Sequence, residues 1–148
     1  MTNRLRYPYS RIPAQSALIK VRPLLPIILE YRETQHNILG LLDSGADVSG
    51  LPYEIGLLLG LDWQKQKLSV NLGGNLGRYE ARIVVVSASV GNTSPSLLVF
   101  AWTQAPNVPL ILGQANFFKR YNVHFFGADE YFEIERRSDE ETPITFME

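Results

Sequence analysis

The stretch Leu41-Leu42-Asp43-Ser44-Gly45-Ala46-Asp47 decides how this sequence is interpreted. Its first two residues end an apolar run, residues 38–42, that predicts a buried strand, and a carboxylate follows this run at once. One interpretation is an ordinary turn, opened by Asp43 and Ser44 and given backbone freedom by Gly45. The setting favours more than a turn, because an acid placed directly after a buried strand and beside small residues lies at the mouth of the core.

The overall composition excludes several classes of protein. A chain of 148 residues, 45% of them hydrophobic, fits one domain that buries roughly 70% of its unfolded surface. With 14 Lys+Arg against 15 Asp+Glu, the net charge of -1 gives no basic excess for binding nucleic acid. The absence of cysteine excludes a disulfide framework, a thiolate zinc site and a thiol nucleophile.

The apolar stretches are too short to suggest a membrane protein. Residues 1–15 mix arginines with prolines and contain no apolar segment typical of a secretory signal. The longest apolar stretch, residues 24–29, is broken by Pro26 and is far below the ~20 residues that a membrane span needs. We therefore expect a cytoplasmic protein without a membrane span.

Strand patterns dominate and follow one another at short spacing, which predicts an all-β fold: a closed or nearly closed, mainly antiparallel barrel. Residues 68–86 form a predicted hairpin whose tip is Gly73-Gly74-Asn75-Leu76-Gly77. Two short helices are expected, at 52–61, with Leu57, Leu58 and Leu61 on one side, and at 113–120. The other predicted strands are 17–22, 27–31, 38–42, 97–102, 109–112, 121–126 and 131–135.

Three elements in order resemble the retropepsin-like aspartic proteases. Residues 41–47 resemble the catalytic loop of that family, two apolar residues followed by Asp-Thr/Ser-Gly-Ala. Leu110-Ile111-Leu112-Gly113 resembles the motif that packs beneath this loop, and the glycine-rich tip occupies the place of the flap. The resemblance covers residues 15–135 and is closer to cellular and bacterial single-domain members than to viral ones. It divides the chain into an N-terminal extension (1–14), the protease domain (15–136) and a C-terminal tail (137–148).

The resemblance implies a peptide-hydrolysing enzyme with two carboxylates that share a proton. Because the chain holds a single Asp-Ser-Gly, the second carboxylate would come from a second copy, so the implied enzyme is a C2 homodimer with no metal and no cofactor. Asp43 would be the catalytic residue, supported by Ser44, Gly45 and Ala46. The residues that would bind an extended peptide substrate are Asp47, Gly73, Gly74, Asn75 and Leu76.

Gln114 departs from the viral pattern, in which an arginine after the second motif pairs with the acid at the position of Asp47. A neutral amide cannot form that ion pair. The setting of Asp47 and part of the dimer contacts therefore differ from the viral pattern. The alternative to an active protease is a retropepsin-like module that has lost catalysis and serves in dimerisation or peptide binding.

A calcium loop over residues 43–54 is a further alternative for the same carboxylates. Asp43, Asp47 and Glu54 fall at ligand positions, but Val48 stands where the sharp turn needs glycine and Pro52 interrupts the loop. This pattern does not favour a metal site.

Overall fold

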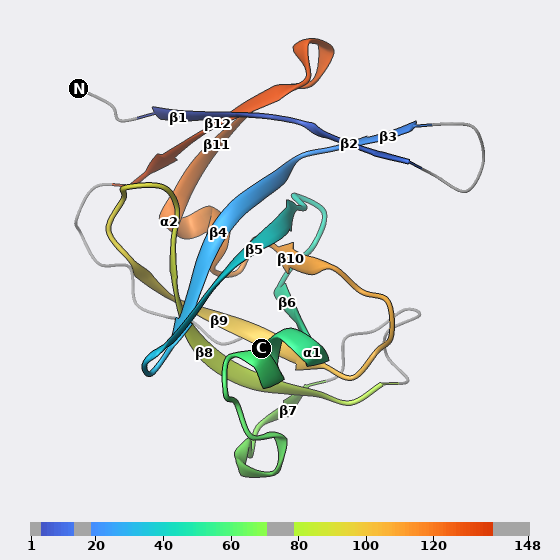
Figure 1. Cartoon of the computed structure of the whole chain (residues 1–148), viewed down its shortest axis with the longest axis vertical. Helices are drawn as coiled ribbons and strands as arrows, with labels where there is room; N and C mark the ends of the chain where they lie inside the picture. The colour runs from blue at the N-terminus through green and yellow to red at the C-terminus, as the bar shows by residue number, and fades with distance from the viewer. Residues whose placement is uncertain (1–3, 14–18, 71–78, 138–148) are drawn as a thin grey trace.

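The computed structural model describes residues 4–13, 19–70 and 79–137, and most of them lie in strands (Figure 1). The larger sheet closes into a barrel of six strands in the order β4, β5, β10, β6, β9, β8, and β8 pairs back onto β4. Their bounds are β4 Leu24–Tyr31, β5 Thr34–Leu42, β6 Ser49–Pro52, β8 Ala81–Ser89, β9 Ser96–Thr103 and β10 Leu110–Leu112. The predicted all-β fold with a closed barrel is confirmed.

The barrel is mainly antiparallel, with two parallel contacts that local alternation does not predict. Strand β10 runs parallel to β5, and β6 runs parallel to β9. The remaining contacts around the barrel are antiparallel. The short strand β10 therefore lies in the interior of the sheet, between β5 and β6, although it is only three residues long.

Alternate residues of the barrel strands fill the core. On β4 the side chains of Leu25, Ile27 and Leu29 are buried while their neighbours reach the surface, as a strand with one face on the core requires. Large side chains from β9 and β10 complete this core: Leu98, Phe100, Trp102, Leu110 and Leu112.

A second sheet joins the two ends of the described chain. Strand β12 (Tyr131–Arg136) lies between β1 (Arg4–Pro8) and β11 (Tyr121–Phe126), so that the blue and red ends of the ribbon run side by side in Figure 1. A separate pair is formed by β2 (Ser10–Pro13) and β3 (Ile19–Arg22). Phe132 and Ile134 of β12 are fully buried. The segment predicted to be an N-terminal extension thus contributes two strands.

Two short helices are present, α1 (Tyr53–Leu58) and α2 (Phe117–Arg120), with single turns η1 (Trp63–Lys65) and η3 (Gly127–Asp129). The prediction that Leu57, Leu58 and Leu61 share one side was wrong. Leu57 and Leu58 are exposed while Leu61 is buried, because the helix ends at Leu58 and Gly60, with φ of +88°, turns the chain. Helix α1 instead presents Gly56 to Trp102, where a side chain would collide with the indole.

No helix among the described residues is long and apolar enough to cross a membrane.

Candidate active site

Asp43 follows β5 and is held in place by the neighbouring strand β10. Leu41 lies beside Ile111 and Leu42 beside Leu112 in the parallel register. One residue beyond the end of β5, the backbone N–H of Asp43 donates to the carbonyl oxygen of Leu112 at 3.0 Å. Because parallel strands end at the same edge of a sheet, the loops that follow β5 and β10 meet there. The two motifs singled out in the sequence are therefore adjacent in space.

The backbone after Asp43 forms a tight turn. The Oδ1 atom of Asp43 accepts a hydrogen bond from the N–H of Gly45 at 3.0 Å, and its carbonyl oxygen accepts from Ala46 at 3.1 Å. An aspartate that binds the backbone two residues on is the usual way in which this residue opens a turn. The turn by itself is compatible with a structural role for Asp43 as well as a catalytic one.

Donors from the second motif fix the far side of this loop. The N–H groups of Gln114 and Ala115 donate to the carbonyl oxygens of Ala46 and Asp47, both at 2.8 Å. The N–H of Gly113 donates to Oγ of the buried Ser49 at 3.0 Å. Two of these residues thus bind the loop itself, and Gly113 binds the first residue of β6, which follows it. An ordinary surface turn has no such support.

Ser49 was missed as a positioning residue by the sequence analysis. The signal available was a hydroxyl residue in a short segment of otherwise small or apolar residues, which predicts a buried polar group that needs a partner. The partner, the backbone of Gly113, is distant in sequence and could not be identified from local pattern.

Gly113 is required by the closeness of the two loops. A Cβ at this position would collide with the carbonyl group of Val48 and would lie 2.8 Å from the carbonyl oxygen of Ala46. The contact can form only where one residue has no side chain. The glycine of the second motif is explained by this packing.

Gln114 uses its side chain within the loop. Its Nε2 donates to the carbonyl oxygen of Ser44 at 2.8 Å. The side chain of Asp47 is exposed and makes no ion pair with the residues that the structure describes. The amide therefore braces the backbone next to Asp43, a role that the sequence analysis did not assign to it.

The side chain of Asp43 is half-buried at this edge of the barrel, while Ser44, Gly45 and Asp47 are exposed. Leu41, two residues earlier, shares its side of the chain, since alternate residues of an extended strand face the same way. Leu41 and its neighbour Ile111 are both half-buried. The carboxylate thus stands beside an apolar surface that remains partly open to solvent.

The predicted flap residues Gly73, Gly74, Asn75 and Leu76 lie outside the described residues. The two arms that lead to them are described and antiparallel. Strand β7 (Ser69–Val70) pairs with the beginning of β8, and the N–H of Ile83 donates to the carbonyl oxygen of Leu68 at 2.9 Å. The arms predicted for this hairpin are therefore in place up to the ends of the described segments.

The calcium-loop alternative is not compatible with the backbone. Residues Ser49–Pro52 form β6, an extended strand between β10 and β9, in the middle of the segment that would have to wrap around an ion. In the described part of the chain, no group of three or more His, Asp or Glu side chains is arranged to hold a metal. His36 and His124 lie on β5 and β11, in different sheets.

No protein-family model matches this sequence, and no curated protein matches it. Its fold is similar to the crystal structure of a retropepsin-like aspartic protease from Rickettsia conorii, with a TM-score of 0.58 and 14% sequence identity. The match covers 92% of this chain and 94% of the other. The chain therefore has the fold of a retropepsin-like aspartic protease.

Proposed function

We propose that this chain is an aspartic endopeptidase that acts as a homodimer, with Asp43 from each copy in the catalytic pair. One observation carries the proposal: a half-buried aspartate lies at the open edge of the barrel, in a loop fixed by the backbone of residues 112–115. The fold shared with a retropepsin-like protease supports it.

Two aspartates about 3 Å apart cannot both be ionised, so they share one proton. The ionised member takes a proton from a water molecule, whose oxygen attacks the peptide carbonyl carbon. The protonated member donates to the carbonyl oxygen, which gives a tetrahedral diol. Collapse of the diol breaks the C–N bond, and the leaving nitrogen takes up a proton from the pair. No metal or cofactor enters this scheme.

Among the residues that the structure describes, a single copy of the chain offers no equivalent partner for Asp43. Asp62 uses its Oδ1 to accept from the N–H of Gln64 at 3.0 Å and caps the turn η1. Asp129 lies in η3, in the connection between β11 and β12 of the other sheet. Neither stands in a loop like that of Asp43, which supports a second copy as the source of the second carboxylate.

The remaining roles follow from this arrangement. The Ser44 hydroxyl would bond across the dimer axis, and Gly45 and Ala46 would leave room for the substrate backbone. Asp47 and the flap residues Gly73, Gly74, Asn75 and Leu76 would bind an extended peptide through its main chain. The apolar side chains of the bound peptide would contact Leu41 and Ile111, the half-buried pair beside Asp43.

The test is hydrolysis of a peptide library by the purified protein beside Asp43→Asn, which preserves shape but cannot form the acid–base pair. The matched control is Asp129→Asn, the same change at an exposed position in η3. We expect cleavage by the wild type and the control, inhibition by a statine-type compound, and loss of about three orders of magnitude or more in Asp43→Asn. Equal cleavage by all three proteins would refute the assignment.

A protein that dimerises and binds peptides without cleaving them would instead support the inactive binding module. Sedimentation equilibrium and peptide binding, measured on the same three proteins, separate this outcome from a misfolded preparation.

A further inference from the structure

We propose that Arg82 is a positioning residue for peptide binding, which anchors the segment 59–68 and the short strand β7 to the barrel strand β8. The inference rests on the proposed function and deepens it, since β7 and β8 lead to the residues assigned to the peptide main chain. The anchor itself consists of contacts among described residues, so it can be tested apart from catalysis.

Arg82 lies on the core-facing side of β8. Arg82, Val84 and Val86 alternate along this strand and face the same way, and both valines are buried. The side chain of Arg82 is only 17% exposed. A cation in this position is costly unless its donors are satisfied, so Arg82 needs acceptors at this end of the barrel.

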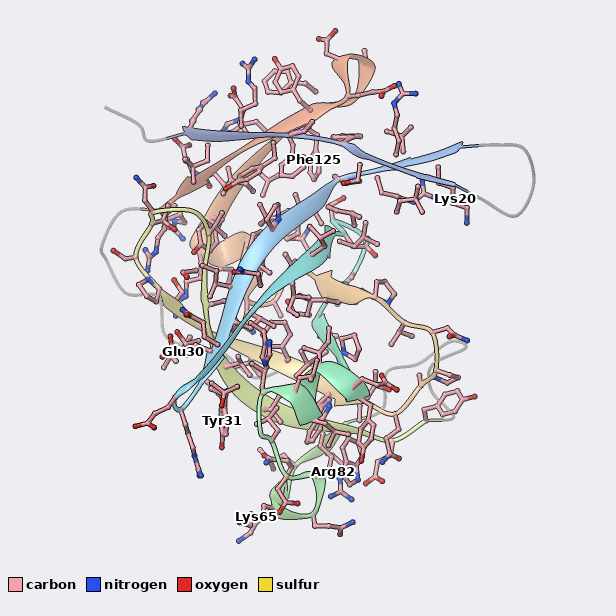
Figure 2. The ribbon with its side chains drawn as sticks, viewed as in Figure 1. Lys20, Glu30, Tyr31, Lys65, Arg82 and Phe125 are labelled. Carbon is pink, nitrogen blue, oxygen red and sulfur yellow. The ribbon has the colours of Figure 1, made fainter. Side chains whose placement is uncertain are left out.

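The segment 59–68, between α1 and β7, supplies two of these acceptors. The Nη1 atom of Arg82 donates to the carbonyl oxygens of Trp63 and Gln66, the second at 3.4 Å. The guanidinium lies over the indole of Trp63, 4.5 Å from the ring centre, and Trp63 packs edge-on against the buried Trp102. Figure 2 shows Arg82 near this segment, which also carries the exposed Lys65. Arg82 thus holds the first residue of η1 and the residue that follows η1.

A carboxylate extends the anchor to β7. The Nε and Nη2 atoms of Arg82 donate to Oε1 of Glu80 at 3.1 and 3.0 Å. The same oxygen accepts from the hydroxyl of Ser69, on β7, at 3.4 Å. Ser69 also lies opposite Arg82 in the antiparallel register. The guanidinium therefore connects both arms of the hairpin with the segment that precedes them.

The backbone alone holds β7 weakly. The strand has two residues, and its pairing with β8 is extended by one bond, from the N–H of Ile83 to the carbonyl oxygen of Leu68. So short a pair of strands is marginally stable by itself. Strand β8, in contrast, pairs with β9 along Ala81–Ala88. The firmly held strand thus carries the side chain that anchors the weakly held one.

Amide hydrogen exchange in full-length Arg82→Met and Arg82→Lys tests the anchor. Exchange in residues 63–70 and at Ile83 should become about tenfold faster in Arg82→Met, while β4 and β5 exchange as in the wild type. Arg82→Lys should not restore slow exchange, because an ammonium group cannot bond acceptors on two sides while stacking on an indole. The matched control is Lys65→Met, which removes an exposed cation from the same segment and should change nothing.

Two results of the exchange experiment would overturn the anchor. Exchange in residues 63–70 that is as slow in Arg82→Met as in Lys65→Met would show that the contacts of Arg82 do not hold the segment. Faster exchange everywhere, β4 and β5 included, would show that Arg82 stabilises the whole barrel rather than this part of it.

A fluorescein-labelled statine-type peptide measures the role of Arg82 in peptide binding. We expect its Kd to be about tenfold higher in both Arg82 variants and unchanged in Lys65→Met. In cleavage assays KM should rise with little change in kcat, because Arg82 bonds to residues outside the loop of Asp43. Equal Kd values in the Arg82 variants and the control would overturn the positioning role. A wild type that neither binds nor cleaves would refute the proposed function and this role with it, whereas the exchange rates would still decide the anchor.

Discussion

The N–H of Asp43 and the carbonyl oxygen of Leu112 are joined by a 3.0 Å hydrogen bond, one residue beyond the last parallel pair of β5 and β10. This bond continues the parallel ladder into the loop, so the backbone of Asp43 belongs to the rigid sheet while its side chain stands at the edge. A catalytic group needs this combination, because small errors in position are costly in rate.

Replacing Gly113 by alanine should destabilise the protein by about 3 kcal/mol, because the new methyl group would overlap the backbone of Val48. Urea denaturation measures the change. Gly50→Ala is the matched control, since a Cβ at Gly50 would meet Ile111 at an ordinary 3.8 Å. A cost for Gly113→Ala no larger than that of the control would contradict the packing described for the two loops.

Gln114→Met keeps the length of the side chain but removes the donor to Ser44. We expect a loss of about 1 kcal/mol in the free energy of unfolding and a decrease of about tenfold in kcat/KM, since the loop beside Asp43 loses a brace. Gln104→Met, at another exposed glutamine, should change neither value. Full activity in Gln114→Met would show that the amide does not position the loop.

If the proposed homodimer forms, Ser44→Ala should leave the folded monomer intact and weaken the association of the two copies. Within the described residues, only the carbonyl oxygen of Ser44 is engaged, by Gln114, which leaves its hydroxyl available to a second copy. Loss of one such bond from each copy should raise the dissociation constant of the dimer about tenfold or more. Ser44→Thr, which retains the hydroxyl, should restore the dimer in analytical ultracentrifugation, and equal constants for the two variants would count against this bond.

The sheet that joins the chain ends should make stability dependent on acidity. Hydrogen bonds from Arg6, at 2.8 and 3.0 Å, lower the pKa of Glu133 below its usual 4.5, with a further contribution from Arg4. A group with a lowered folded-state pKa contributes stability above its unfolded pKa, and this contribution is lost as the pH falls through the folded value.

Acidification below about pH 4.5 should therefore reduce the free energy of unfolding more in the wild type than in Glu133→Gln. Urea titrations at successive pH values measure the difference, with Glu54→Gln, an exposed change on α1, as the control. If the free energy of unfolding depended on pH in the same way in the wild type and in Glu133→Gln, Glu133 would not be a source of this pH dependence.

Most strands of the barrel could be predicted from apolar runs or from local alternation, but β6 (Ser49–Pro52) was not predicted as a strand. The strands β1 and β2 were missed, because the prolines and arginines in this segment hide the alternation of Leu5 and Tyr7. In addition, β1 pairs with β12, which is far away in the sequence. The parallel contacts of β10 and β6 were missed for a similar reason: pairing between distant segments leaves no local signal.

The position of Asp43 was predictable because the acid follows an apolar run directly. The hydrogen bonds that hold the loop of Asp43 in place were only partly predictable. The sequence pointed to Gly113, but the bonds from Gln114 to Ser44 and from Gly113 to Ser49 depend on how two distant loops meet.

Activity in mixtures of the wild type with Asp43→Asn tests the shared active site most directly. If each active centre needs Asp43 from two copies, an equal amount of the variant should capture wild-type chains in mixed dimers and reduce peptide cleavage to about half. A threefold excess should reduce it to about one quarter. Cleavage that stays constant as the variant is added, under conditions where mixed dimers form, would contradict the account, because each chain would then act alone.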